Sequence, residues 1–279
     1  MNNIYLIKII SVVGITLFFS ACSHKIPETS QIKQTSITKL PTEKAPLLSF
    51  LQKTDQELGE RSAFYPLSAP TDAFAARLFL IDQATTSLDV QYYIYKADTT
   101  GKVFAAHLLM AAHRGVKVRM LIDDLGTTGK DEQWQKLASH PNIELRLFNP
   151  NTLRTSFRNL ALLYNVNSLG KRMHNKSLIA DGSAAIIGGR NIGDDYFAST
   201  AKTLFLDYDI LAIGKVVPDI YQAFDLYWNS KEAVPSEYVL DHQDTVPHLL
   251  STEELKQELR AYEESPAGQA IIHSEFNRK

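Results

Sequence analysis

A histidine, a lysine and an aspartate stand close together in the stretch MHNKSLIADG, where Lys176 follows His174 by two residues and Asp181 follows Lys176 by five. Side chains two apart on a β-strand share a face, so a strand over Met173–Ala180 would project His174 and Lys176 together. An imidazole nitrogen can attack phosphorus, and an adjacent ammonium neutralises phosphate oxygens. The stretch is therefore interpreted as part of a phosphoryl-transfer site.

Two glycines and an asparagine follow the next apolar run, at Gly188, Gly189 and Asn191. Glycines allow a ligand to approach the backbone closely, and the asparagine amide can donate a hydrogen bond to a phosphate oxygen. The histidine–lysine–aspartate spacing is a weak signal alone, and this neighbouring element strengthens it.

Helical and strand patterns alternate before this stretch, which predicts an α/β fold with a largely parallel sheet and helices on both faces. Thr71 is expected to cap the first helix, and Gly115 to end the second. The expected helices are 71–84, 100–115 and 130–138, and the expected strands are 87–95, 116–123 and 143–148.

The later part of the chain has a different pattern. Two strands flank the tight turn at Gly182-Ser183, and a further strand is expected over Thr203–Ile213. A helix over Lys215–Ser230 follows, with Phe224, Tyr227 and Trp228 on its sheet-facing side. The segment after Lys231 is polar, with one helix expected over Thr252–Glu264.

The N-terminus reads as a leader that is removed. An apolar run from Ile9 to Ala21 is too short to span a bilayer and is typical of a signal peptide. Phe19-Ser20-Ala21-Cys22 resembles a bacterial lipobox, so Cys22, the only cysteine, is expected to carry lipid. Ser23 favours the periplasmic face of the outer membrane over the inner membrane. Residues 22–46 then form a flexible tether, and folded patterning begins near Leu47.

The charge balance disfavours a nucleic-acid partner. The formal net charge is −2, and removal of the leader takes one further cation, Lys8. Only a small basic cluster, Lys171, Arg172 and Arg190, is available to meet a phosphodiester backbone, whereas nucleic-acid-binding domains usually present a strong basic field.

The chain resembles the phospholipase D superfamily, whose H-K-D motif matches His174, Lys176 and Asp181 and whose G-[GS]-x-N element matches Gly188, Gly189 and Asn191. The segments LIDQATTSLDVQYYIY, AAHRGVKVRMLIDD, GGRNIGDDYF and FDLYWNS resemble the N-terminal half of bacterial cardiolipin synthases. The resemblance implies an αβα sandwich with a mixed, mostly parallel sheet, here a single lobe over 47–231. Residues 232–279 resemble a connection between lobes.

By this resemblance His174 is the nucleophile of a phosphohistidine intermediate, and Lys176 and Asn191 hold phosphate oxygens. Asp207 falls where the family places the carboxylate that orients the histidine, although Asp209 shares its strand face and could serve as well. Asp181 belongs to the catalytic motif, and a structural function at the turn is favoured for it.

The resemblance implies no metal and no other cofactor. A metal site at Asp123 and Asp124 is the competing interpretation, because these carboxylates end a parallel strand. His113, in the last turn of its helix, is explained by the helix dipole.

The family usually carries two such motifs, and this chain has one, since no lysine stands two residues after His242, His248 or His273. Three accounts follow, in order of preference: half of a longer or split protein whose other lobe is a separate C-terminal chain, a twofold homodimer, or an inactive lipid-binding remnant. The expected substrate is a membrane phospholipid such as phosphatidylglycerol or phosphatidylethanolamine. A tethered nuclease and a non-catalytic phospholipid-binding lipoprotein are the alternatives.

Overall fold

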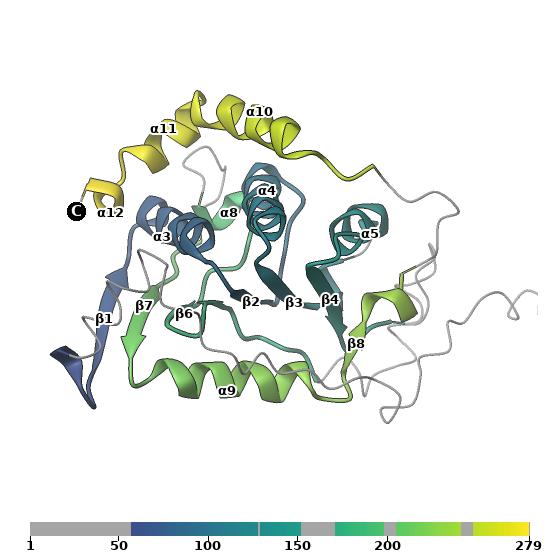
Figure 1. Ribbon diagram of the computed structural model, residues 1–279, viewed down its shortest axis with the longest axis horizontal. Helices are drawn as coiled ribbons and strands as arrows, with labels where there is room; N and C mark the ends of the chain where they lie inside the picture. The colour runs from purple at the N-terminus through teal and green to yellow at the C-terminus, as the bar shows by residue number, and fades with distance from the viewer. Residues whose placement is uncertain (1–56, 128, 152–170, 198–204, 241–247, 279) are drawn as a thin grey trace, which may run out of the picture.

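The computed structural model describes residues 57–127, 129–151, 171–197, 205–240 and 248–278 (Figure 1). The expected leader, Cys22, the tether and His242 lie outside these residues. Within them, no helix combines the length and the apolar character needed to cross a bilayer.

An eight-stranded mixed sheet forms the centre of the described chain, in the order β1-β7-β6-β5-β2-β3-β4-β8. Among the pairings of these strands, only β2–β3 and β3–β4 are parallel. The α/β class is confirmed, but the expectation of a mostly parallel sheet is wrong, because a hairpin and three further antiparallel strands extend the parallel centre. The strands are β1 Ser62–Leu67, β2 Ser87–Tyr92, β3 Lys117–Asp123, β4 Ile143–Phe148, β5 Ser177–Ala180, β6 Ala184–Gly188, β7 Asp209–Gly214 and β8 Ala233–Pro235.

Helices cover both faces of the sheet, as expected (Figure 1). Three helices, α3 (Pro70–Gln83), α4 (Thr99–His113) and α5 (Asp131–Ala138), lie on one face, and α9 (Val217–Trp228) lies on the other. Alternate residues of each strand divide between the two cores, so that Met120 and Ile122 join the α3–α5 side while Leu121 joins the α9 side.

The N-terminus of α3 differs from the expectation. Thr71 does not cap α3, because Pro70 occupies the first turn and Ala69 is the N-cap residue, without a side-chain hydrogen bond. Proline suits this position, since its missing N–H would have no helical partner there. Gly115 does follow the end of α4 with φ +97°, a conformation that favours glycine.

The helix α9 places its aromatic side against the sheet, which confirms the expectation. Phe224 and Trp228 are buried, and the Tyr227 ring contacts Phe148 with 5.8 Å between centroids. The guanidinium of Arg119 lies 4.8 Å from the centroid of the Phe224 ring, so that a buried cation is held between the sheet and this helix.

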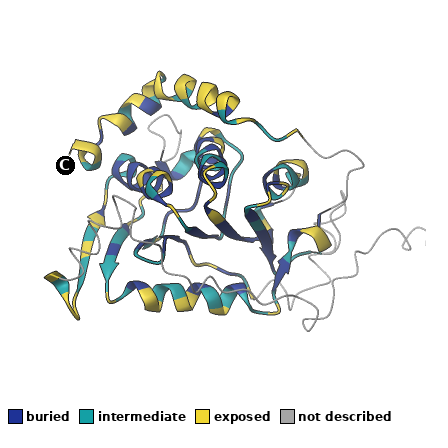
Figure 2. Cartoon of the chain, in the orientation of Figure 1, coloured by how far each residue is buried: buried dark blue, intermediate teal, exposed yellow. Residues whose placement is uncertain are grey.

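The described part of the C-terminal segment packs onto the lobe. Strand β8 extends the sheet beside β4, and α10 (Thr252–Glu263), α11 (Pro266–Ile272) and α12 (Glu275–Arg278) lie across α3 and α4. Much of α10 is exposed (Figure 2). Leu255, on the side of α10 that faces α4, is buried. The packed unit therefore extends past the boundary expected at Lys231.

Candidate active site

His174, Lys176 and Gly188 lie at the same end of the central strands. Ser177, the first residue of β5, pairs with Gln91 near the end of β2, so that His174 and Lys176 lie just beyond the end of β2. Gly188 ends β6 opposite Asp209, the first residue of β7. The carboxyl ends of the parallel strands β2, β3 and β4 meet at the same edge, which is where α/β proteins bind ligands.

His174 and Lys176 are in direct contact. The Lys176 Nζ atom lies 3.0 Å from Nδ1 of His174 and donates a hydrogen bond of 2.5 Å to the His174 carbonyl. His174 is exposed, whereas Lys176 is 5% exposed. The structure thus places an exposed imidazole beside a buried ammonium, and the nucleophilic role of His174 remains a prediction. Only the start of the strand differs, because β5 begins at Ser177 and both His174 and Lys176 lie in the loop before it.

Tyr93 supports both groups, and the sequence alone did not single it out. Its ring centroid lies 4.8 Å from that of His174 and 5.5 Å from Lys176 Nζ. An aromatic face attracts an ammonium and restricts the imidazole plane, so contact with this tyrosine helps to orient both side chains.

Burial lowers the pKa of Lys176, and the nearby Asp207 carboxylate opposes this effect. Asp207 precedes β7 and also lies against Gly189, where an added Cβ would come within 2.9 Å of the Asp207 Cγ atom. The structure therefore brings Asp207, Gly189 and Lys176 together, while an Asp207–His174 contact remains a prediction.

Gly188 allows β6 and β7 to approach each other. A Cβ at this position would lie 2.5 Å from the Tyr208 carbonyl oxygen and 2.6 Å from the Asp209 Cα atom. Its backbone N–H points toward the Lys176 carbonyl, at 3.4 Å. Strand packing thus explains why a glycine stands at position 188, and the contact of Gly188 with phosphate remains a prediction.

Asn191 is buried beside the site and already has two partners. Its Oδ1 accepts from the Ile94 N–H at 2.9 Å, and its Nδ2 donates to the Tyr196 hydroxyl at 2.9 Å. An amide nitrogen has two hydrogens, so one remains for the predicted phosphate contact. These two bonds show that Asn191 fixes the loop after β2.

Asp209 is not an alternative to Asp207. It is fully buried and forms ion pairs with Arg77 at 3.0 Å and with Arg190 at 3.1 Å. The expected basic surface cluster is also wrong. Arg190 is buried in this ion pair, and Arg172 pairs with Asp123, which leaves Lys171 exposed without them.

Asp181 lies at the other end of β5 from His174. Its carboxylate accepts hydrogen bonds from the backbone N–H groups of Thr85, Thr86 and Ser87 at 3.0, 2.8 and 2.9 Å. Its own backbone adopts φ +53° at the hairpin turn. The structure therefore places Asp181 in a structural contact between the turn and the loop before β2.

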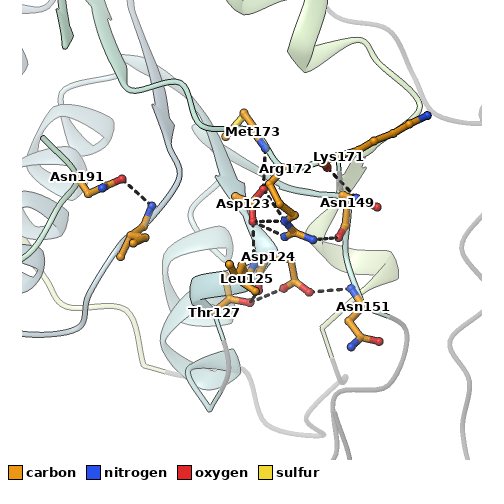
Figure 3. A network of polar contacts seen from close by, with 11 residues as sticks. Asp123, Asp124, Leu125, Thr127, Asn149, Asn151, Lys171, Arg172, Met173 and Asn191 are labelled. Atoms are coloured by element: carbon orange, nitrogen blue, oxygen red, sulfur yellow. Dashed lines mark hydrogen bonds and ion pairs between the residues drawn. The ribbon is translucent and has the colours of Figure 1, made fainter. Parts of the chain in front are cut away.

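A polar network holds the segment before His174 (Figure 3). The fully buried Asp123 carboxylate accepts from Arg172 Nε at 2.9 Å and from the backbone N–H groups of Leu125 and Met173 at 3.0 and 2.9 Å. Arg172 also donates to the Asn149 carbonyl at 3.2 Å. The network ties the ends of β3 and β4 to Met173, the residue before His174.

This network occupies the carboxylate that the metal interpretation required. Within the described residues, no group of three or more histidine, cysteine, aspartate or glutamate side chains is placed to hold a metal ion. His113 lies in the last turn of α4, as expected, and it also contacts Thr252 Oγ1 at 3.0 Å and the His140 ring at 5.0 Å between centroids.

Comparison with known proteins gives one consistent result. The family model described as cardiolipin synthase, PLD-like domain, matches residues 78–228. The chain is 48% identical to cardiolipin synthase C of Escherichia coli over 177 residues, 63% of this chain and 37% of that protein. It is 38% identical to an uncharacterized protein of Helicobacter pylori over 237 residues, 85% of this chain and 47% of that protein.

A solved structure with a remote similarity is that of Nuc from Salmonella typhimurium, a phospholipase D family member. It shares 21% identity and a TM-score of 0.44, covering 63% of this chain and 98% of that chain. The chain spans less than half the length of the two relatives above.

Proposed function

The chain belongs to the family of cardiolipin synthase, phospholipase D-like domains, and from this premise we propose that it supplies the nucleophilic lobe of a phosphatidyl-transfer site. The observation that carries the proposal is the contact between the exposed His174 imidazole and the Lys176 ammonium, 3.0 Å apart at the ligand-binding edge of the sheet. Tyr93 and the Asp123–Arg172 network hold this pair in place.

In the proposed first step, an imidazole nitrogen of His174 attacks the phosphorus of a phospholipid. An N–P bond forms while the P–O bond to the departing alcohol breaks, and the departing oxygen takes up a proton. The Lys176 ammonium stabilises the charge on the non-bridging oxygens, and Asn191 adds an amide donor.

In the second step, an acceptor hydroxyl attacks the phosphohistidine and loses its proton, and the N–P bond breaks to release His174. A lipid glycerol hydroxyl as acceptor gives synthesis of a larger phospholipid, and water gives hydrolysis. The phosphatidyl donor is proposed to be phosphatidylglycerol or phosphatidylethanolamine.

The proton for the departing alcohol is proposed to come from a second H-K-D lobe, supplied by a separate C-terminal chain or by a second copy of this chain. The lengths of the relatives support this, because each extends well beyond the part that this chain matches. The lobe is further proposed to be anchored through Cys22 at the periplasmic face of the outer membrane, which would confine it to its substrate.

The test is covalent trapping on the full-length chain, alone and with a candidate second lobe, using phosphatidylglycerol labelled with ³²P in vesicles. Acid-labile, base-stable label on the protein is expected, absent in His174→Ala and retained in the control His248→Ala, whose histidine is exposed on the C-terminal segment. The same assay with labelled DNA distinguishes a nuclease. Absence of label from both substrates, with the molar mass of each preparation known, would contradict the proposal and favour a binding protein.

A further inference from the structure

A cavity of about 260 Å³ lies between α4, α5 and the C-terminal segment, within the part of the chain that is described. Its walls are mostly apolar. Leu109 of α4, Leu137 of α5, and Leu250 and Leu255 of the C-terminal segment line it, with the ring of Trp134. Three separate segments thus border a half-open space that apolar atoms can fill.

Lysine side chains stand around this apolar space. Lys102, Lys130 and Lys136 line the cavity, and Glu258 is the only carboxylate among its described lining residues. An excess of positive charge beside apolar walls matches a ligand that has an anionic group and a hydrocarbon part.

Lys130 is positioned to hold the anionic group. Its Nζ atom donates to the carbonyls of Tyr95 at 3.0 Å and Gly126 at 2.9 Å. A lysine ammonium has three donors, so one remains for a ligand. Burial lowers the pKa of Lys130, with Lys96 acting in the same direction and Asp98 against it. A bound anion would offset the burial of this cation.

The size of the cavity limits the ligand. Cavities for drug-sized molecules usually hold about 300–1,000 Å³, so this space suits one slender chain and not a two-chain lipid. We propose that it binds a single-chain anionic amphiphile, with its chain among Leu109, Leu137 and Leu255 and its anionic group at Lys130. This site is separate from the catalytic pair, although both adjoin the segment Tyr93–Tyr95, where Tyr93 contacts His174 and Tyr95 lines the cavity.

The experiment uses the full-length chain and a dodecanoate probe that carries a photoactivatable diazirine, with labelled peptides mapped by mass spectrometry. Label is expected on α4 around Leu109 and on the segment Leu250–Leu255. Unlabelled dodecanoate and lysophosphatidylglycerol compete as two sources of the same chemistry, and dodecyltrimethylammonium is the control of opposite charge. Displacement by either anionic competitor and not by the cation supports the proposal and identifies the source.

Two variants act on different parts of the site. Lys130→Met removes the cation and is expected to lower labelling about tenfold, the effect of losing one charged hydrogen bond. Ala105→Trp fills the cavity and is expected to lower labelling by excluding the hydrocarbon chain. Lys117→Met, at an exposed lysine on β3, and His174→Ala are expected to label like the wild type. Label placed elsewhere, equal displacement by the cationic amphiphile, or full labelling of both cavity variants would overturn the proposal.

Discussion

At the scale of single residues, the charge of Lys176 sets a pH limit on the proposed reaction. Burial lowers its pKa, so the ammonium loses its proton at a lower pH than an exposed lysine would. The transfer rate is expected to fall as the pH rises through the lowered pKa of Lys176.

Separate substitutions of Lys176 and Asp207 test this pH limit, because one should remove the alkaline decline and the other should shift it to lower pH. Lys176→Arg keeps its charge at all accessible pH values, so we expect a rate lowered about tenfold by the altered geometry but without the alkaline decline. Asp207→Asn removes the charge that raises the Lys176 pKa, so the decline should begin at lower pH. Rates measured across pH, with Lys171→Arg as the control, check both; identical alkaline limits in all four proteins would refute the assignment.

The two adjacent glycines are expected to respond differently to alanine. At Gly189 the new Cβ meets the Asp207 carboxylate, which can rotate away, so activity should fall about tenfold while the fold is retained. At Gly188 the Cβ meets backbone atoms of the neighbouring strand, so we expect a loss of about 1–3 kcal/mol in the free energy of unfolding.

Urea unfolding and activity assays on both alanine variants separate these effects. Equal losses of unfolding free energy in the two proteins would contradict the prediction that a Cβ is tolerated at Gly189 and not at Gly188.

At the scale of elements, the Asp123–Arg172 pair connects the end of β3 to the residues before His174. Arg172→Met would leave a fully buried carboxylate without its main counter-charge, which we expect to cost about 3 kcal/mol at neutral pH. The pKa of Asp123 is already raised by burial, and loss of Arg172 raises it further.

The sign of the pH effect follows from this shift. The folded-state pKa of Asp123 lies above its unfolded value, so the ionised carboxylate opposes folding as pH rises through the folded value, and its protonation at lower pH removes this cost. The gap in unfolding free energy between wild type and Arg172→Met should therefore narrow toward acid. Denaturation at several pH values measures it, with Lys256→Met as a surface control. A gap that is constant with pH would argue against a buried unpaired charge.

Elements with strong local patterns could be predicted from the sequence, and long-range pairings could not. The segments around β2, α4, β3, α5 and β4 were placed to within a few residues, since each has a clear apolar period and a turn signal. The edge strands β1 and β8 could not be predicted because their backbone partners are far away in sequence. The same reason hid the burial of Arg190, which depends on Asp209 and on the carbonyls before α3.

The candidate site was predictable for a different reason. His174, Lys176, Gly188, Gly189 and Asn191 stand in two short motifs, so their types and spacing were visible in the sequence. Tyr93 and the Asp123–Arg172 pair carried no such signal, because their relation to the motif arises only when β2 and β3 are placed beside β5.

At the scale of the whole molecule, the C-terminal helices are expected to contribute to stability. Leu255 of α10 is 1% exposed against α4. Leu255→Ala should lower the free energy of unfolding by about 2–4 kcal/mol, as large-to-small changes in a core do. Gln257→Ala, at an exposed position on the same helix, should leave stability unchanged. Urea unfolding compares them, and an unaffected Leu255→Ala protein would mean that α10 does not pack as described.

The short strand β5 gives the motif spacing a geometric meaning. Its four residues lie between Lys176, at the ligand edge, and Asp181, whose carboxylate is fixed to Thr85–Ser87. At about 3.3 Å per residue, the number of residues between Lys176 and Asp181 sets the distance between them along β5. One inserted residue would turn every following side chain to the opposite face. Asp181 therefore fixes one end of β5, and the length of this strand sets the position of Lys176 at the other end.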